Sequence, residues 1–309
     1  MTRRHPLSFP ASISMALLSS ICWSVAPVLS RFVRDYYSVS FQNFFRFGVS
    51  LCILWIFTLA RLGRSGVHGA FSSVSRPVLK LTGLSVCIFI HQMLYLAGIY
   101  RLYPALASLL SEGNVVYTIL MAYLMFRDER STIRNVRFIL GMALALGGMA
   151  VIILTGSRID TLEADLGVIF IVLSALAWSF FTVLTKHWIP TVPASLSTSV
   201  IFTINTLMFL IVILFPRGPV LFPVKPPPSA WLILALSGLL GIGGGYTFYF
   251  AAIPGAGVTL TSSLGLLIPL FTALSSYLIL GELLLPLQVL AGIVLLGGCY
   301  LIIRARYRA

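Results

Sequence analysis

Charged side chains are scarce in this chain. Only 9% of its 309 residues are Asp, Glu, Lys or Arg, and 8 are acidic, whereas soluble domains carry about 25% charged residues. Hydrophobic residues make up 59% of the sequence and the mean hydropathy is +1.01. A water-soluble fold has no interior large enough to hide so much apolar surface. The composition therefore excludes a soluble globular protein and a disordered chain, and it indicates a helical membrane protein.

Cysteine and motif-forming polar residues are equally sparse. The four cysteines lie singly inside apolar runs, without the spacing of a metal or redox site, so we interpret them as small buried hydrophobes. No intramembrane aspartate pair, His-Glu-x-x-His motif or usable serine–histidine pair occurs. We expect no catalytic residue, no metal and no cofactor.

Long apolar runs are abundant. A helix needs roughly twenty apolar residues to cross a bilayer, and ten runs approach or exceed that length. They are 11–30, 41–60, 79–99, 103–126, 133–155, 166–185, 193–215, 230–253, 257–280 and 284–303. The short connectors leave no room for a soluble catalytic domain. The sequence thus predicts an all-α membrane protein with ten transmembrane helices.

The basic residues lie mostly between these runs. With the N-terminus inside, fourteen Lys and Arg fall in cytoplasmic segments and six on the other side, which the positive-inside rule favours. This distribution predicts that both termini are cytoplasmic. It also explains the net charge of +13 without nucleic acid as a partner.

The two halves of the chain resemble one another. Trp23-Ser24 recurs as Trp178-Ser179, Glu129 matches Glu282, and Gly147-Gly148 matches Gly297-Gly298. Five helices per unit is an odd number, so the halves, 1–155 and 156–309, must insert in opposite orientations. Inverted repeats are typical of carriers that work by alternating access.

The sequence resembles the drug/metabolite transporter superfamily, and in particular its EamA-type ten-helix carriers. The matching features are a Trp in helix one, an Arg early in helix two and Glu-containing turns after helices four and nine: Cys22-Trp23-Ser24, Phe45-Arg46-Phe47, Arg127-Asp128-Glu129 and Gly281-Glu282. One departure is Val115, where the family commonly has a proline that would match Pro269. The resemblance implies export of amino acids and other small metabolites.

Three ionisable residues fall well inside the predicted spans: Arg46, His91 and Glu112. Such groups are costly in a membrane and by default functional, and a rise of about 1.5 Å per residue places all three at similar depth. Glu112 is a candidate for proton coupling or for binding a substrate ammonium group, and alternatively an ion-pair partner of Arg46. Arg46 either binds a substrate carboxylate or snorkels to the interface. His91 either relays protons or donates to a backbone carbonyl.

Aromatic side chains suit an amphipathic substrate because they combine apolar area with one polar group. The candidate wall residues are Trp23, Tyr95, Tyr117, Trp178, Tyr246 and Tyr249. Some of them belong instead to interfacial belts if they face lipid headgroups. Asn114 and Ser262 are candidate polar contacts or interhelical hydrogen bonds.

We further expect helix packing or gating at the glycines 241–245, a kink at Pro269, and capping of the following helices by Glu129 and Glu282.

Together these features predict a secondary active transporter in the cell inner (plasma) membrane. It is expected to export small amphipathic metabolites, amino acids first, by rocking its two halves. Efflux of lipophilic or cationic drugs by proton antiport is the alternative, and a channel or intramembrane enzyme fits less well. The expected partners are a small-molecule substrate, membrane lipid and protons; the sequence leaves a monomer and a homodimer open.

If Glu112 carries the coupling proton, Glu112→Gln removes the titratable group without changing its size. Transport by this variant should lose its dependence on a pH gradient while the protein still folds. Uptake into proteoliposomes at several external pH values measures this, and an unchanged pH profile would exclude Glu112 from coupling.

Overall fold

In a computed structural model of the chain, the described residues are 8–72, 75–102, 110–111, 113–156, 164–215, 221–268, 270–272, 274 and 286–307. Throughout these ranges the regular structure is helical and no strand occurs. The first half contains α1 (Phe9–Phe32), α2 (Val39–Ser72), α3 (Pro77–Arg101), α5 (Gly113–Met125), α6 (Arg127–Ile133) and α7 (Val136–Gly156). The all-α prediction is confirmed for this part of the chain.

The second half contains more interruptions than the first. It comprises α8 (Ala164–Trp188), α9 (Ala194–Leu214), α10 (Pro228–Ser237), the π-helix η1 (Gly238–Gly245), α11 (Tyr246–Ala256), α12 (Val258–Ser263), the 3₁₀ turn η2 (Leu264–Leu267) and α14 (Pro286–Tyr307). The run predicted at 230–253 is therefore a single apolar stretch with a π-helical middle. Gly257, which has a φ of 87°, interrupts the helix between α11 and α12.

One predicted connector is helical instead. The apolar run of helix two ends near Ala60, but α2 continues to Ser72 through a kink at Gly63, whose φ is 64° and ψ 172°. Only glycine adopts such a conformation without strain. The short helix α6 likewise occupies the connector before α7.

Six helices are long and apolar enough to cross a membrane by length and composition. Their spans are Phe9–Phe32, Val39–Ala60, Pro77–Arg101, Leu166–Trp188, Ser195–Leu214 and Pro228–Ala256. Three shorter apolar helices, Gly113–Met125, Val136–Gly148 and Val289–Ala305, accompany them in the described residues, together with the apolar helix α12 and the turn η2 that follows it. The chain is thus a multi-pass membrane protein.

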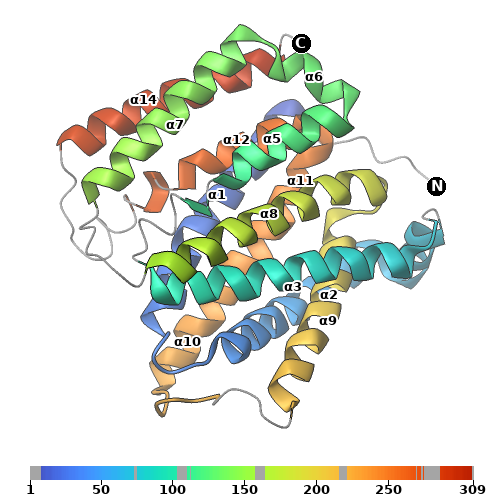
Figure 1. Cartoon of the computed structure of the whole chain (residues 1–309). Coiled ribbons are helices and arrows are strands. Elements are labelled where there is room, and N and C mark those ends of the chain that lie inside the picture. Colours follow the sequence, from blue (N-terminus) through green and yellow to red (C-terminus); the bar gives the residue numbers. More distant parts are fainter. Residues whose placement is uncertain are drawn as a thin grey trace.

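Each half packs mainly against the other half. The most extensive helix pairs are α7 with α14, α3 with α8, α2 with α9, and α1 with α11 and η1. Figure 1 shows α7 and α14 side by side at one edge of the bundle, and α3 running along α8. The start of α1 and the end of α14 lie at the same end of the bundle, which we call the terminus end. The core is therefore an interface between the halves.

The contact between α7 and α14 depends on glycine. A Cβ added to Gly148 would lie 2.6 Å from the Ala291 carbonyl oxygen, and one on Gly298 would lie 2.6 Å from the Gly141 carbonyl oxygen. Small residues allow this approach of two backbones, and packing of this kind drives helix association in lipid.

The outer surface is apolar. Large hydrophobic side chains such as Ile56, Val78 and Leu214 are each more than 70% exposed. Such a surface would aggregate in water but matches the hydrocarbon of a bilayer. Polar groups are accordingly concentrated between the helices, where the candidate site lies.

The glycine packing is tested by the pair Gly148→Ala and Gly147→Ala. The added methyl at 148 meets the backbone of α14, whereas nothing lies within 4 Å of a Cβ at 147. Overpacking costs about 1–3 kcal/mol, so Gly148→Ala should lower the Tm of the detergent-solubilised protein by several degrees and Gly147→Ala should not. Equal Tm values for the two variants would contradict this packing.

Candidate functional site

Four aromatic residues from three helices meet in the middle of the bundle. Trp23 of α1, Trp178 of α8, and Tyr246 and Tyr249 of α11 form what we call the central aromatic cluster. The two indole rings pack edge to face, with centroids 5.2 Å apart. Each of them contacts both tyrosines at 5.2 to 5.7 Å. The two tryptophans that the repeat aligns therefore lie in contact in the structure.

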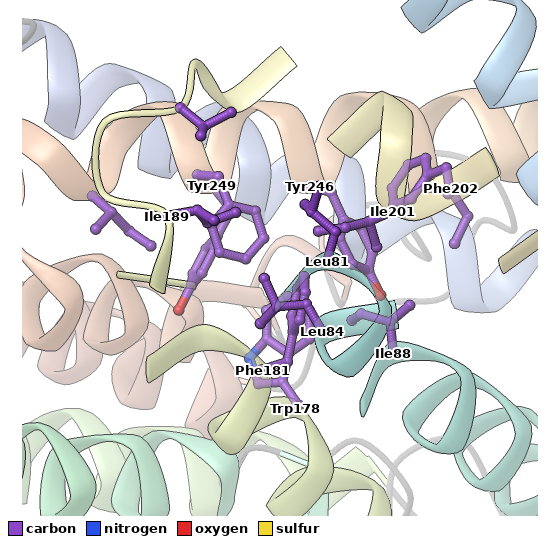
Figure 2. Packing of buried hydrophobic residues seen from close by; sticks show 14 of the residues in the cluster. Leu81, Leu84, Ile88, Trp178, Phe181, Ile189, Ile201, Phe202, Tyr246 and Tyr249 are labelled. Atoms are coloured by element: carbon purple, nitrogen blue, oxygen red, sulfur yellow. The ribbon is translucent and has the colours of Figure 1, made fainter. Parts of the chain in front are cut away.

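The cluster is backed by a continuous apolar core. Figure 2 shows Trp178, Tyr246 and Tyr249 packed among aliphatic side chains that include Leu84 and Ile88. Tyr246 is 1% exposed and Tyr249 3%. Edge-to-face packing of this kind adds about 0.5–1.5 kcal/mol per pair beyond burial. The rings thus form a rigid wall with polar groups at its edges.

The π-helix η1 positions this wall. π-Helical segments are rare and are frequently found at functional sites, and η1 is rich in glycine. The Ser19 hydroxyl donates to the Gly245 carbonyl oxygen at 2.9 Å. The Ser50 hydroxyl lies 2.8 Å from the Gly238 carbonyl oxygen and shares its proton with the carbonyl of its own helix. Side chains of the first half thus bind the backbone of the second.

Trp23 makes the third bond of this set. Its indole nitrogen donates to the Gly241 carbonyl oxygen at 2.9 Å. A Cβ on Gly245 would overlap the indole, and one on Gly241 would lie 2.5 Å from the Ala26 Cβ. Gly241 and Gly245 are therefore required by the close approach of α1, which explains part of the glycine cluster seen in the sequence.

Arg46 lies beside the same π-helical segment. It is 4% exposed, and its Nη2 lies 3.2 Å from the position that a Cβ on Gly241 would occupy. Its Nε is buried without a hydrogen-bond partner, and no hydrogen bond joins its guanidinium to another described residue. Burying a cation without such partners costs free energy. It does not snorkel to the interface, and its donors remain available.

His91 is held by the facing helix. Its Nδ1 lies 3.1 Å from the carbonyl oxygen of Ser174 and 2.8 Å from the hydroxyl of the same residue. A carbonyl only accepts, so this bond assigns the proton to Nδ1 and leaves Nε2 as an acceptor in the neutral ring. The ring stacks on Tyr95 at 5.6 Å and contacts Trp178 at 5.2 Å. One of the two roles considered for His91, a hydrogen bond to a backbone carbonyl, is thus present. The ring contacts also place His91 and Tyr95 beside the cluster.

Polar groups line the edges of the cluster. The Tyr249 and Ser262 hydroxyls are 2.6 Å apart, so Ser262 joins the candidate site through α11. The Gln92 side-chain amide donates to the Tyr246 hydroxyl at 2.7 Å, while its carbonyl oxygen is buried without a partner. Our sequence reasoning missed Gln92. An uncharged amide within an apolar run is the signal that would have found it.

The remaining predicted site residues lie elsewhere. The Asn114 side-chain amide donates to the Ser111 carbonyl oxygen at 2.6 Å, which indicates a local role at the start of α5. The backbone carbonyl oxygen of Asn114 accepts from the Ser179 hydroxyl. In the described part of the chain no ring contact joins Tyr117 to the central aromatic cluster. Glu112 lies outside the described residues, as do Pro269 and Glu282.

Glu129 has a different partner from the one predicted. We expected it to cap the helix that follows, but its Oε1 accepts from the backbone N–H of Val258 at 3.0 Å and from Lys186 Nζ at 2.7 Å. Both partners belong to the second half. Sequence spacing alone favours a local cap, and only the packing of α5 against α8 and α12 brings the distant partners within reach.

The role of η1 is tested by comparing Gly245→Ala with Gly243→Ala. The first methyl displaces the Trp23 indole and breaks its bond to Gly241, whereas the nearest atom to a Cβ at 243 lies 3.6 Å away. We expect Gly245→Ala to weaken the near-UV circular dichroism of the packed tryptophans and to lower the Tm, with Gly243→Ala close to wild type. Identical spectra for both variants would contradict the proposed contact.

Comparison with known proteins fits this architecture. The EamA-like transporter family matches residues 10–154 and again 165–304. An uncharacterized protein of Pseudomonas aeruginosa is 30% identical over 222 residues, covering 72% of each chain. The uncharacterized transporter YyaM of Bacillus subtilis is 23% identical over 272 residues, covering 87% of this chain and 86% of its own.

A solved crystal structure shares the fold. It superposes with a TM-score of 0.78 at 16% identity and covers 97% of this chain and 99% of its own. An uncharacterized transporter of Haemophilus influenzae is 28% identical over 190 residues, which are 61% of this chain and 62% of that one. Two family matches that together span nearly the whole sequence show that the chain belongs to the EamA-like transporter family, within the drug/metabolite transporter superfamily.

Proposed function

We propose that this protein is a secondary active transporter that exports small amphipathic metabolites, amino acids foremost, across the cytoplasmic membrane. Membership of a transporter family and the multi-pass helical fold support the general class. The observation that carries the finer proposal is Arg46, a buried guanidinium with available donors, next to the central aromatic cluster.

A carboxylate is the substrate group that fits Arg46 best. Guanidinium and carboxylate form paired, charge-assisted hydrogen bonds that are strong where water is excluded. Arg46 and Trp23 both meet the backbone at Gly241, so a ligand bound to the guanidinium would have its apolar part beside aromatic rings. Our proposal is that substrate binding compensates the buried charge.

The charge distribution favours an anionic or zwitterionic substrate over a cation. The described acidic side chains whose surroundings are given are Asp35, Asp128 and Glu129, and none lies beside the cluster. Glu112 is the candidate for the substrate ammonium group of a zwitterion. Efflux of lipophilic cations is the second candidate, because it would use Glu112 and the aromatic faces without Arg46.

The packing of the halves supports alternating access. In an inverted repeat each helix of the first half has an equivalent in the second half. The contact of α3 with α8 is then equivalent to that of α11 with α1, while the contacts of α2 with α9 and of α7 with α14 each join a helix to its own equivalent. These are the helix pairs with the most extensive contacts. A rocking motion of one half against the other would then expose the cluster to each side in turn.

The substrate class is tested by thermal stabilisation of the purified protein with a matched ligand set: leucine, leucinamide and 4-methylpentanoate, together with a lipophilic cation. A ligand at 100 times its Kd adds about 2.7 kcal/mol to the apparent stability, which is a rise in Tm of a few degrees. We expect leucine to raise the Tm and leucinamide to raise it much less. The rise with leucine should be smaller in Arg46→Lys, because lysine keeps the positive charge but lacks the planar guanidinium group.

Stabilisation by the amide and the lipophilic cation alone would overturn the amino-acid proposal and support drug efflux. A panel of other amino acids, measured in parallel, separates a wrong side chain from a wrong substrate class.

A further inference from the structure

A compact group of charges joins the two halves at the terminus end. Glu129 of α6 accepts from Lys186 Nζ of α8 at 2.7 Å and from the backbone N–H of Val258, the first residue of α12, at 3.0 Å. Asp128 also accepts from Lys186 at 2.8 Å. We call Glu129, Lys186 and the Val258 amide the charge latch.

The two acidic residues of α6 differ in burial. The Glu129 side chain is 1% exposed, whereas that of Asp128 is 58% exposed. An exposed pair contributes little to stability, whereas removing one partner of a buried pair leaves an uncompensated buried charge. Glu129 therefore carries most of the interaction, and Asp128 is a natural control for it.

Lys186 is fixed from a further side. Its ammonium group lies 4.3 Å from the centre of the Phe126 ring, which belongs to the residue just before α6. Lys186 thus contacts the first half through both a carboxylate and an aromatic face. The contacts of the latch cross between halves, because α6 belongs to the first half and both α8 and α12 to the second.

The opposite end of the bundle has a different kind of contact between the halves. There Tyr37 and Phe41 of the first half pack against Trp231 of α10, with ring centroids 5.2 and 5.9 Å apart. The only ion pair shown there among the described residues joins the sequence neighbours Arg34 and Asp35 and crosses no interface. One end therefore relies on buried charge and the other on aromatic packing.

The latch is directly connected to the candidate site. Ser262 follows Val258 by four residues, so the two lie on one face of the helical segment. The Ser262 hydroxyl contacts Tyr249 of the central aromatic cluster. A movement of α12 away from Glu129 would consequently also move a wall of the cluster.

We propose that Glu129 is the gating residue of the terminus end: its bonds to Lys186 and Val258 close that end, and both break when the halves rock apart to admit substrate there. This rests on the proposed alternating-access function but not on the substrate class. Rocking separates α6 from α8 and α12 and leaves the bonds within each half intact. The latch biases the resting protein toward closure at the terminus end.

The test measures access to a reporter cysteine in the absence of substrate. The native cysteines are replaced and Ser262→Cys is introduced. A membrane-impermeant maleimide is applied separately to inside-out and right-side-out vesicles that contain the full-length protein. Glu129→Gln removes the charge at constant size, and Asp128→Asn makes the same change at the exposed neighbour.

We expect Glu129→Gln to raise the labelling rate from the terminus side by at least about tenfold, which corresponds to 1.4 kcal/mol in the gate equilibrium. Asp128→Asn should stay within about threefold of the parent protein, in line with the small contribution of an exposed pair. Lys186→Gln can still donate a hydrogen bond to Glu129 and should give an intermediate labelling rate. This variant replaces Glu129→Gln as the test if Glu129→Gln does not fold. Equal rates for Glu129→Gln and Asp128→Asn in folded protein, or faster labelling from the opposite side, would overturn the proposal.

These outcomes are independent of the ligand experiment. Faster labelling without any stabilisation by carboxylates would keep the gate and reject the substrate class. Stabilisation by leucine with no change in labelling would keep the substrate class and reject the gate.

Discussion

The hydrogen bonds between the first half's side chains and the carbonyl oxygens of η1 are the interaction on which the centre of this protein depends. A bilayer offers no water to satisfy freed backbone groups, so irregular helix is tolerated only where protein satisfies it. Trp23 and Ser19 of α1 do so at Gly241 and Gly245. The Trp23 indole lies against Trp178, and Arg46 packs against Gly238 and Gly241 of the same π-helical segment, so the candidate site is built around the irregular helix.

The use of polar groups follows the same constraint throughout the bundle. Close backbone packing at glycines holds α7 to α14 without any hydrogen bond between polar side chains being needed. Among the described residues that are buried, two are charged, Glu129 and Arg46, and both lie where helices of opposite halves meet. Glu129 accepts two hydrogen bonds through Oε1 while its Oε2 is buried without a partner, and no hydrogen bond joins the Arg46 guanidinium to another described residue. We interpret the first as a contact that closes the protein and the second as one that awaits a substrate.

Sequence reasoning succeeded where a residue's role depends on its type and depth. The apolar runs indicated the six long apolar helices, and the repeat aligned Trp23 with Trp178, which lie in contact. It failed where the partner lies on another helix. Glu129 was assigned to the next helix and in fact reaches α12, while Gln92 passed unnoticed because an uncharged amide gives a weak signal. The continuation of α2 to Ser72 was missed because polar and small residues there resemble a loop.

By itself, the sequence determined the class of protein, because an apolar excess of this size is compatible only with a membrane, and its internal similarity determined that two related halves exist. Only the tertiary structure decided which residues meet. The π-helical turn, the Ser174 partner of His91 and the charge latch all depend on how helices from opposite halves pack. A single chain's pattern encodes the face and depth of each side chain, but contacts between segments 57 to 129 residues apart arise only from close packing in three dimensions.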